Sequence, residues 1–225
     1  MTKFSQYLHQ IYGKISAFYK GAKKSKTASL NSSEYLSFSN LLLYKSPSDN
    51  YSINNAETIE IFYNIRTDID KLNYATLISR MIYDVTEENI PSYDILQLFL
   101  NTLYTISETD KNLDLVLSIF KLRLLCILGF TPKIDKCVNC NEHEGLKYFS
   151  IRDNGIKCSA CSKQDKSSIE MSLSTLNAIK YTVTAPPKKL YSFNIKDESL
   201  EEFKLITKIY FDNKLEKEYK IEDLF

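Results

Sequence analysis

Glycine and histidine are scarce in this sequence, and their scarcity argues against several classes of enzyme. Its 225 residues include 5 glycines, and neither the phosphate-binding pattern G-x-x-x-x-G-K-[ST] nor the dinucleotide-binding pattern G-x-G-x-x-G occurs. The 2 histidines, His9 and His143, lie 134 positions apart, and both H-E-x-x-H and G-x-S-x-G are absent. No histidine-centred dyad or triad is indicated, so we predict that the protein is not an enzyme.

Long apolar segments are also lacking. The most apolar run, residues 113–130, is interrupted by Lys121 and Arg123, which argues against a membrane span. Residues 1–14 are polar throughout, without the apolar core of a secretory signal. The overall composition, 44% hydrophobic and 25% charged, is that of an ordinary globular protein, and we predict a cytoplasmic location.

Acidic residues are absent from the first 33 positions, which contain six lysines. Because the net charge is +1, the remaining residues sum to 1 − 6 = −5, and a basic face at one end of the molecule is predicted. Lysines beside aromatic residues are what single-strand binding requires, although a solvated lysine-rich loop has the same composition. The lysines concerned are Lys20, Lys23, Lys24 and Lys26, beside Tyr12, Phe18 and Tyr19.

Four of the 5 cysteines form two C-x-x-C pairs: Cys137, Cys140, Cys158 and Cys161. Two such pairs supply the tetrahedral sulfur shell of a structural zinc site, and four protein ligands leave no position open for catalysis. A redox or disulfide pair, an iron–sulfur cluster and a site in which His143 replaces one thiol are the alternatives. Asn141, after the first pair, is expected to be left-handed, and Cys126 is expected in the core.

The apolar pattern predicts an α+β protein. Strands are expected over residues 14–20 and 35–44, with a short third strand at residues 51–53. From Ala56 the spacing becomes helical. Further helices are expected over residues 72–85, after Pro91, over residues 113–128, over residues 172–181 with Leu173, Leu176 and Ile179 inward, and behind a capping box at Ser199-Leu-Glu-Glu202. Most acidic residues are interpreted as solvated surface charges.

Two stretches together resemble the RecO family of recombination mediators. The first, residues 12–26, is similar to the basic strand and loop of that family. The second is Leu128-Gly-Phe-Thr-Pro, which leads into Cys137-Val-Asn-Cys140 and is followed by Asn154-Gly155 and Cys158-Ser-Ala-Cys161. It is similar to the lead-in and four-cysteine zinc finger of the family, and the resemblance extends over nearly the whole chain.

The resemblance implies an N-terminal OB-like β domain over residues 1–54 that binds DNA. It further implies an all-α domain over residues 55–225 with an inserted zinc finger at residues 133–166. One structural Zn²⁺ per chain would be held by the four paired cysteines. The implied DNA-binding residues are Lys14, Lys20, Lys23, Lys24 and Lys26.

The resemblance also implies a function without catalysis. Family members bind single- and double-stranded DNA and anneal complementary strands. They act with RecR and the C-terminal tail of single-strand binding protein to load recombinase at gaps during bacterial DNA repair, at the nucleoid. The alternative is a zinc-ribbon adaptor for protein interactions that does not contact nucleic acid directly.

Three departures from the family pattern stand out. Asn141 stands where glycine usually follows the first cysteine pair, and Asn154 stands where a glycine is common. Family members also have a strand ahead of the part that residues 1–8 resemble. The sequence therefore predicts either a start upstream of Met1 or an OB-fold without its first strand, whose barrel is open or closed by a partner.

Overall fold

The structure is a computed structural model that describes residues 3–10, 12–19, 34–46 and 51–224. The chain divides into two compact units, Met1–Glu108 and Thr109–Phe225, which we call the N-terminal and the C-terminal unit and describe separately. Among the described residues, no helix combines the length and the apolar character that crossing a membrane requires.

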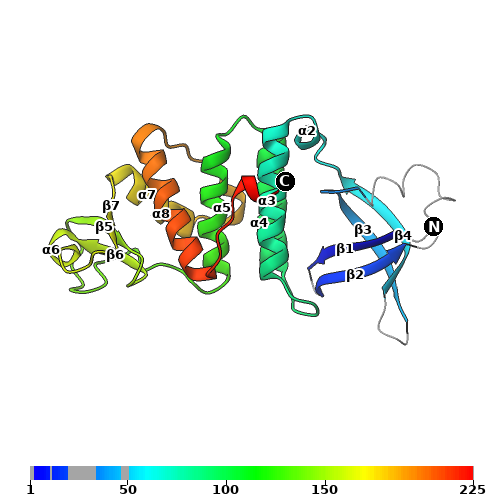
Figure 1. Ribbon diagram of the computed structural model, residues 1–225, viewed down its shortest axis with the longest axis horizontal. Helices are drawn as coiled ribbons and strands as arrows, with labels where there is room; N and C mark the ends of the chain where they lie inside the picture. Colours follow the sequence, from blue (N-terminus) through cyan, green and yellow to red (C-terminus); the bar gives the residue numbers. More distant parts are fainter. Residues whose placement is uncertain (1–2, 11, 20–33, 47–50, 225) are drawn as a thin grey trace. The chain divides into compact units, whose positions relative to one another are not determined.

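The N-terminal unit begins with a four-stranded sheet in the order β1-β2-β4-β3 (Figure 1). Its strands are β1 (Lys3–His9), β2 (Gly13–Tyr19), β3 (Phe38–Lys45) and β4 (Tyr51–Glu60). The β1–β2 and β3–β4 pairs are antiparallel, whereas β2 and β4 are parallel. The strands predicted over residues 14–20 and 35–44 are confirmed with slightly shifted bounds, and the assignment of this sheet as an OB-fold stays a prediction.

The last strand of the sheet is longer than the sequence predicts. The expected change to a helical period at Ala56 is wrong, because β4 continues to Glu60. The pairing of β4 with β3 skips Asn54, and this bulge places Ile53 and Ala56 in the same buried cluster although they are three residues apart. A spacing of three in this bulged strand therefore imitates the spacing of a helix.

The described part of the N-terminal unit also contains the helices α2 (Tyr63–Arg66), α3 (Ile69–Val85) and α4 (Tyr93–Glu108). The side chain of Asp68 caps α3 by accepting hydrogen bonds from the backbone N–H groups of Asp70 and Lys71. The buried residues of α3 recur at the predicted helical spacing. The predicted domain boundary between residues 54 and 55 falls inside β4, and these helices share a compact unit with the sheet.

The turn between β1 and β2 is fastened to the connection between α3 and α4. The backbone N–H of Asn89 donates to the carbonyl oxygen of Tyr12 at 2.9 Å. Gly13 has φ +61°, and a Cβ at this position would lie 2.3 Å from the carbonyl oxygens of both Glu87 and Ile90. Only glycine accommodates this conformation and this close approach, so the turn is held firmly against the connection.

The core of the C-terminal unit consists of α5 (Leu113–Ile127), α7 (Leu173–Thr184) and α8 (Asp197–Leu215), and α8 packs on both other helices (Figure 1). The predicted central helix over residues 113–128 is confirmed, since α5 is buried along most of its length. Gly129 ends it with φ +90°. Arg123 of α5 donates to the carbonyl oxygen of Val183 at 2.7 Å, near the C-terminal end of α7.

The predicted capping box at the start of α8 is wrong. Because α8 begins at Asp197, Ser199 lies inside its first turn, and Glu202 instead caps α7. The Glu202 carboxylate accepts the backbone N–H of Ser172 at 2.8 Å and the hydroxyl of Thr175 at 2.5 Å. Burial opposes the charge, but these hydrogen bonds outweigh it and lower the pKa of Glu202. The S-x-x-E spacing alone does not show where a helix begins.

The prediction that Leu173 faces inward is also wrong. Leu176 and Ile179 are buried as expected, but Leu173 is 71% exposed. Ser172 is the N-cap of α7 and accepts a hydrogen bond from the backbone N–H of Thr175. Leu173 is therefore the first helical residue, where its side chain lies outside the buried stripe.

Between α5 and α7 lies the four-cysteine segment, residues 133–170. It contains β5 (Leu146–Ser150), β6 (Gly155–Cys158), the short helix α6 (Ser159–Ser162) and β7 (Ser168–Glu170), with the strands in the order β6-β5-β7 (Figure 1). Phe149 of β5 meets Tyr210 of α8 edge to face, with ring centroids 5.2 Å apart. The described residues of the unit also include the short 3-10 turns η1 (Pro187–Lys189) and η2 (Ile221–Leu224).

Candidate metal centre and basic surface

The four paired cysteines converge on one point in the four-cysteine segment. The sulfur atoms of Cys137, Cys140, Cys158 and Cys161 all lie within 4.8 Å of one another. Cys158 is the last residue of β6, and Cys161 lies one turn later in α6. The backbone N–H of Val138 donates to the carbonyl oxygen of Ile156 at 3.0 Å, which attaches the first pair to β6. The predicted convergence is confirmed, and His143 is not part of the cluster.

The first cysteine pair lies in a tight knuckle. The backbone N–H of Asn141 donates to the carbonyl oxygen of Cys137 at 3.0 Å, and the N–H of Cys137 donates to the carbonyl oxygen of Glu142 at 2.8 Å. Asn141 has φ +63°, as predicted for the residue after the pair. Asparagine tolerates this left-handed conformation better than most side chains, so the substitution for glycine preserves the turn.

The ionisation of the thiols indicates what the cluster can hold. Burial opposes ionisation of Cys137, but backbone N–H groups of Cys140, Cys158 and Asn139 outweigh it and lower the pKa of this thiol to about 6. Hydrogen bonds to Cys140 and Cys158 raise the pKa of Cys161 to about 12. The cluster alone therefore does not favour four thiolates together. A divalent cation would remove this conflict, so the donor set fits a metal ion that prefers four sulfur ligands.

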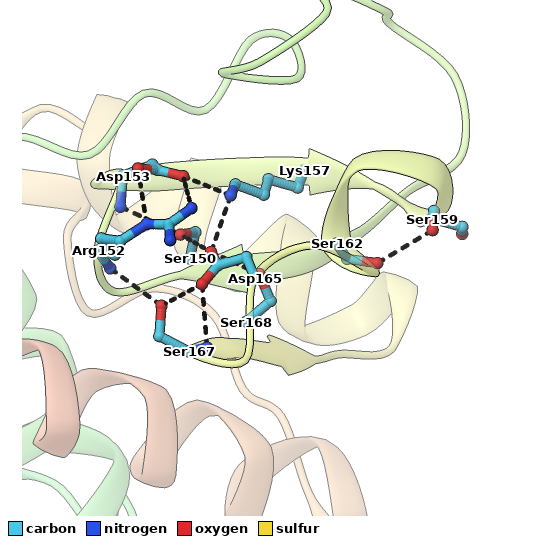
Figure 2. Close-up of polar contacts among 9 residues, drawn as sticks. All are labelled: Ser150, Arg152, Asp153, Lys157, Ser159, Ser162, Asp165, Ser167 and Ser168. Atoms are coloured by element: carbon cyan, nitrogen blue, oxygen red, sulfur yellow. Dashed lines mark hydrogen bonds and ion pairs between the residues drawn. The ribbon is translucent and has the colours of Figure 1, made fainter.

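A buried ion pair lies beside the cluster, and the sequence interpretation missed it. Lys157, on β6 next to Cys158, is 1% exposed, and its Nζ contacts the carboxylates of Asp153 and, at 2.8 Å, Asp165 (Figure 2). Asp165 is itself 4% exposed, so its interpretation as a solvated charge is wrong. It lies in a polar stretch that resembles a linker in the sequence, and only the folded segment brings its partners together.

Serine side chains complete this network around Asp165 (Figure 2). The carboxylate accepts hydrogen bonds from the hydroxyl of Ser167 at 2.7 Å, the hydroxyl of Ser168 at 2.9 Å and the hydroxyl of Ser150. Burial opposes its charge, but Lys157 and these donors outweigh burial and hold the pKa of Asp165 well below its ordinary value. The network joins β5, β6 and the start of β7 without using sulfur.

The predicted DNA-binding lysines fall mostly outside the described residues. Lys20, Lys23, Lys24 and Lys26 lie there, so their role stays a prediction. Lys14 is described: its Nζ donates to the carbonyl oxygen of Tyr83 at 3.1 Å and lies 3.9 Å from the centroid of the Tyr83 ring. This cation is therefore held where β2 meets α3.

Two of the aromatic residues predicted to accompany those lysines are exposed. Tyr12, in the β1–β2 turn, is 44% exposed, and Phe18, on β2, is 36% exposed. The side chain of Tyr19, the third, lies outside the described part of the chain. The N-terminal unit thus presents aromatic surface at Tyr12 and Phe18.

Comparison with known proteins relates the whole chain to one group. Residues 66–221 match the family model described as "Recombination protein O C terminal". A protein of Acetivibrio thermocellus named "DNA repair protein RecO" is 35% identical over 208 residues, which cover 92% of this chain and 82% of that protein. Proteins of the same name from Thermoanaerobacter sp. and Caldicellulosiruptor bescii are 31% and 27% identical, over 94% and 100% of this chain and 85% and 91% of their own lengths.

Proposed function

The chain belongs to the RecO family, and from this premise we propose that it is a non-catalytic DNA-binding protein of bacterial DNA repair and recombination. The observation that carries the proposal is the 35% identity, over 92% of the chain, to a protein named for DNA repair. The lysine-rich N-terminal stretch without acidic residues supports direct contact with a polyanion.

The proposed activity is the binding of single- and double-stranded DNA and the annealing of complementary strands. In this proposal the protein acts at the nucleoid with RecR and with the C-terminal tail of single-strand binding protein, and it loads recombinase at gaps. Lys14, Lys20, Lys23, Lys24 and Lys26 contact phosphates. Annealing needs no reacting side chain, because neutralised phosphates let two strands approach and base pairing supplies the driving force.

The proposed cofactor is one structural Zn²⁺ held by Cys137, Cys140, Cys158 and Cys161. The convergence of the four sulfur atoms within 4.8 Å supports it. A bound zinc ion would supply positive charge that stabilises four thiolates, and it would lock the two cysteine pairs together. With all four ligands from the chain, the site holds the four-cysteine segment in shape and takes no part in a reaction.

A titration of binding against salt tests the proposed DNA contact. Fluorescence anisotropy of a labelled single strand should give a log–log salt slope of about −3 if about four lysines contact phosphates. Reversing the charge of Lys23 and Lys24 should weaken binding and make the slope shallower. Lys188 and Lys189, an exposed adjacent pair in η1, provide the matched reversal, which should leave the slope unchanged. A flat salt response of the unaltered protein contradicts the proposal.

The second candidate is an adaptor whose helical core docks acidic or apolar peptide tails without contacting nucleic acid. The exposed apolar residues Leu205 and Ile209, one turn apart on α8, favour this alternative. It predicts that reversal of Lys23 and Lys24 leaves capture of the partner tail intact, while the unaltered protein binds no oligonucleotide at low salt. The same anisotropy series therefore separates the two candidates.

A further inference from the structure

Three aromatic rings form a row on the N-terminal unit. His9, the last residue of β1, stacks on Tyr12 with ring centroids 5.1 Å apart and an interplanar angle of 24°. Tyr51, the first residue of β4, lies 6.3 Å from Tyr12 between centroids. Lys45, the last residue of β3, places its Nζ 5.7 Å from the centroid of Tyr51. We call His9, Tyr12 and Tyr51 the aromatic row.

The row is fixed by the backbone. The N–H of Tyr12 donates to Nδ1 of His9 at 3.2 Å, and its carbonyl oxygen accepts the N–H of Asn89 at 2.9 Å. The next residue, Gly13, leaves no room for a side chain against the α3–α4 connection. Tyr51 packs on the buried cluster of the sheet. Because Tyr12 is already held at both backbone polar groups, a ligand that stacks on it orders little additional chain.

The middle ring of the row is nevertheless open to solvent, whereas His9 and Tyr51 are half-buried. Tyr12 is 44% exposed, although its neighbour Tyr51 reaches the buried cluster. Packing within the sheet accounts for the position of Tyr51. It does not account for Tyr12, whose ring is held exposed beside Tyr51. A cation at one end and a positioned, exposed ring are the two elements that recognise unpaired nucleobases on a charged backbone.

We propose that the aromatic row is a stacking platform for the bases of single-stranded nucleic acid, with Tyr12 as the contact residue and Lys45 on the adjoining phosphate. This inference rests on the proposed DNA-binding function and adds to it the residues that distinguish single strands from duplexes. In a duplex the bases stack on one another and are not available to Tyr12. The lysines supply affinity for both forms of DNA, and the row supplies the preference for unpaired bases.

The absence of tryptophan from the chain allows a direct test. In a Tyr12→Trp variant of the full chain, the introduced indole is the sole tryptophan, and a base stacked on it quenches its emission. We expect oligothymidylate to quench this emission over the same concentration range in which anisotropy reports binding. An abasic oligonucleotide of the same length carries the same phosphates and should bind without quenching.

The other possible outcomes separate the stacking platform from the proposed DNA binding. If anisotropy shows binding but the emission is unchanged, or if the abasic strand quenches equally, the platform is wrong and the proposed DNA binding stands. If neither oligonucleotide binds at low salt, both the platform and the proposed function are overturned.

A second set of variants separates stacking from folding. Tyr12→Ala should weaken binding to oligothymidylate about tenfold, the loss of one base–aromatic contact, and leave binding to duplex DNA unchanged. The salt slope should not move, because no charge is removed. Tyr12→Phe keeps the ring and should bind normally. Tyr104→Ala, which removes a 59% exposed tyrosine from α4, is the matched control and should have no effect. Equal weakening of single-strand and duplex binding by Tyr12→Ala overturns the inference.

Discussion

The four-cysteine segment and the N-terminal sheet are stabilised in different ways. In the four-cysteine segment, four thiols converge on one point and a buried Lys157–Asp165 pair joins β6 to the residues before β7. In the sheet, the buried cluster consists of Ala17, Ile53 and Ala56, with partly buried side chains around it. The segment thus adds a few strong, specific polar interactions to the burial of apolar side chains such as Phe149 and Ile156, whereas the sheet depends on modest apolar burial and on a tightly fitted turn.

This difference teaches that specific polar interactions can supplement the apolar core of a small element. Apolar burial contributes in proportion to area, so the sheet responds to many substitutions by small amounts. A metal site or a buried ion pair loses most of its contribution when one member is removed. The two regions should therefore respond very differently to single substitutions.

The largest effect is expected from Cys158→Ser. Metal binding by four thiolates contributes on the order of 10 kcal/mol to such a segment, and three ligands retain little of it. We expect loss of bound zinc by elemental analysis and faster amide exchange between residues 129 and 168, with exchange in the sheet unchanged. Cys126→Ser, which alters a thiol of α5 outside the cluster, should keep its zinc. Full zinc content and unchanged exchange in Cys158→Ser would refute a structural role.

Asp165→Asn should have the next largest effect. It removes the better buried of the two carboxylates that contact Lys157 and leaves the ammonium with Asp153 alone. Leaving a buried charge unpaired costs about 3–5 kcal/mol, and because Asp153 remains we expect a loss near the lower end, about 3 kcal/mol. Chemical unfolding monitored by exchange of the four-cysteine segment measures the loss. Adding Lys157→Met should recover part of it, because the buried ammonium that keeps only Asp153 as a partner is then removed. Additive losses in the double variant would show that the two side chains do not interact.

Gly13→Ala tests the turn of the sheet. Residue 13 has φ +61°, and the added Cβ would lie 2.3 Å from two carbonyl oxygens. We therefore expect the free energy of unfolding to fall by about 2–3 kcal/mol. Gly145→Ala in the four-cysteine segment is the matched control, with φ +62° and no described atom within 4 Å of its Cβ. Gly145→Ala should lower the free energy of unfolding by about 1 kcal/mol, from backbone strain alone. Thermal unfolding compares them, and equal losses would mean that the close approach at Gly13 is unimportant.

The smallest effect is a pH dependence confined to the sheet. Burial lowers the pKa of His9 in the folded state below its ordinary value of 6.5, so the unfolded chain takes up the proton first. The contribution of neutral His9 is therefore complete above pH 6.5 and is lost as pH falls below that value. Amide exchange at residues 12–14 should accelerate over this range, and His9→Phe should abolish the dependence. The Asp165 network remains ionised over the same range, because the pKa of Asp165 is far lower.

Local patterns in the sequence predict the features that depend on local spacing. The convergence of the four paired cysteines, the left-handed Asn141 and the central helix α5 are predicted from such patterns and confirmed. Asn141 and α5 are specified by neighbours along the chain. The C-x-x-C spacing brings together the sulfurs within each pair, and the hydrogen bond from Val138 to Ile156 of β6 joins the two pairs.

Features that depend on distant partners were missed. The bulge at Asn54 is set by pairing with β3, and Glu202 caps a helix that begins 30 positions earlier. Asp165 is buried only because Lys157 and the serines of β5 and β7 surround it. The pairing of His9 and Tyr12 with Tyr51 likewise requires the fold of the sheet.

The position of α8 has a consequence for synthesis on the ribosome. The N-terminal unit is complete once residue 108 has left the exit tunnel, so it can fold while the rest is being made. In contrast, α5 packs on α8, and the start of α7 is capped by Glu202 of α8. Until α8 emerges, the nascent chain carries an apolar α5 without its main cover, and chaperones should engage the polypeptide at that stage of translation.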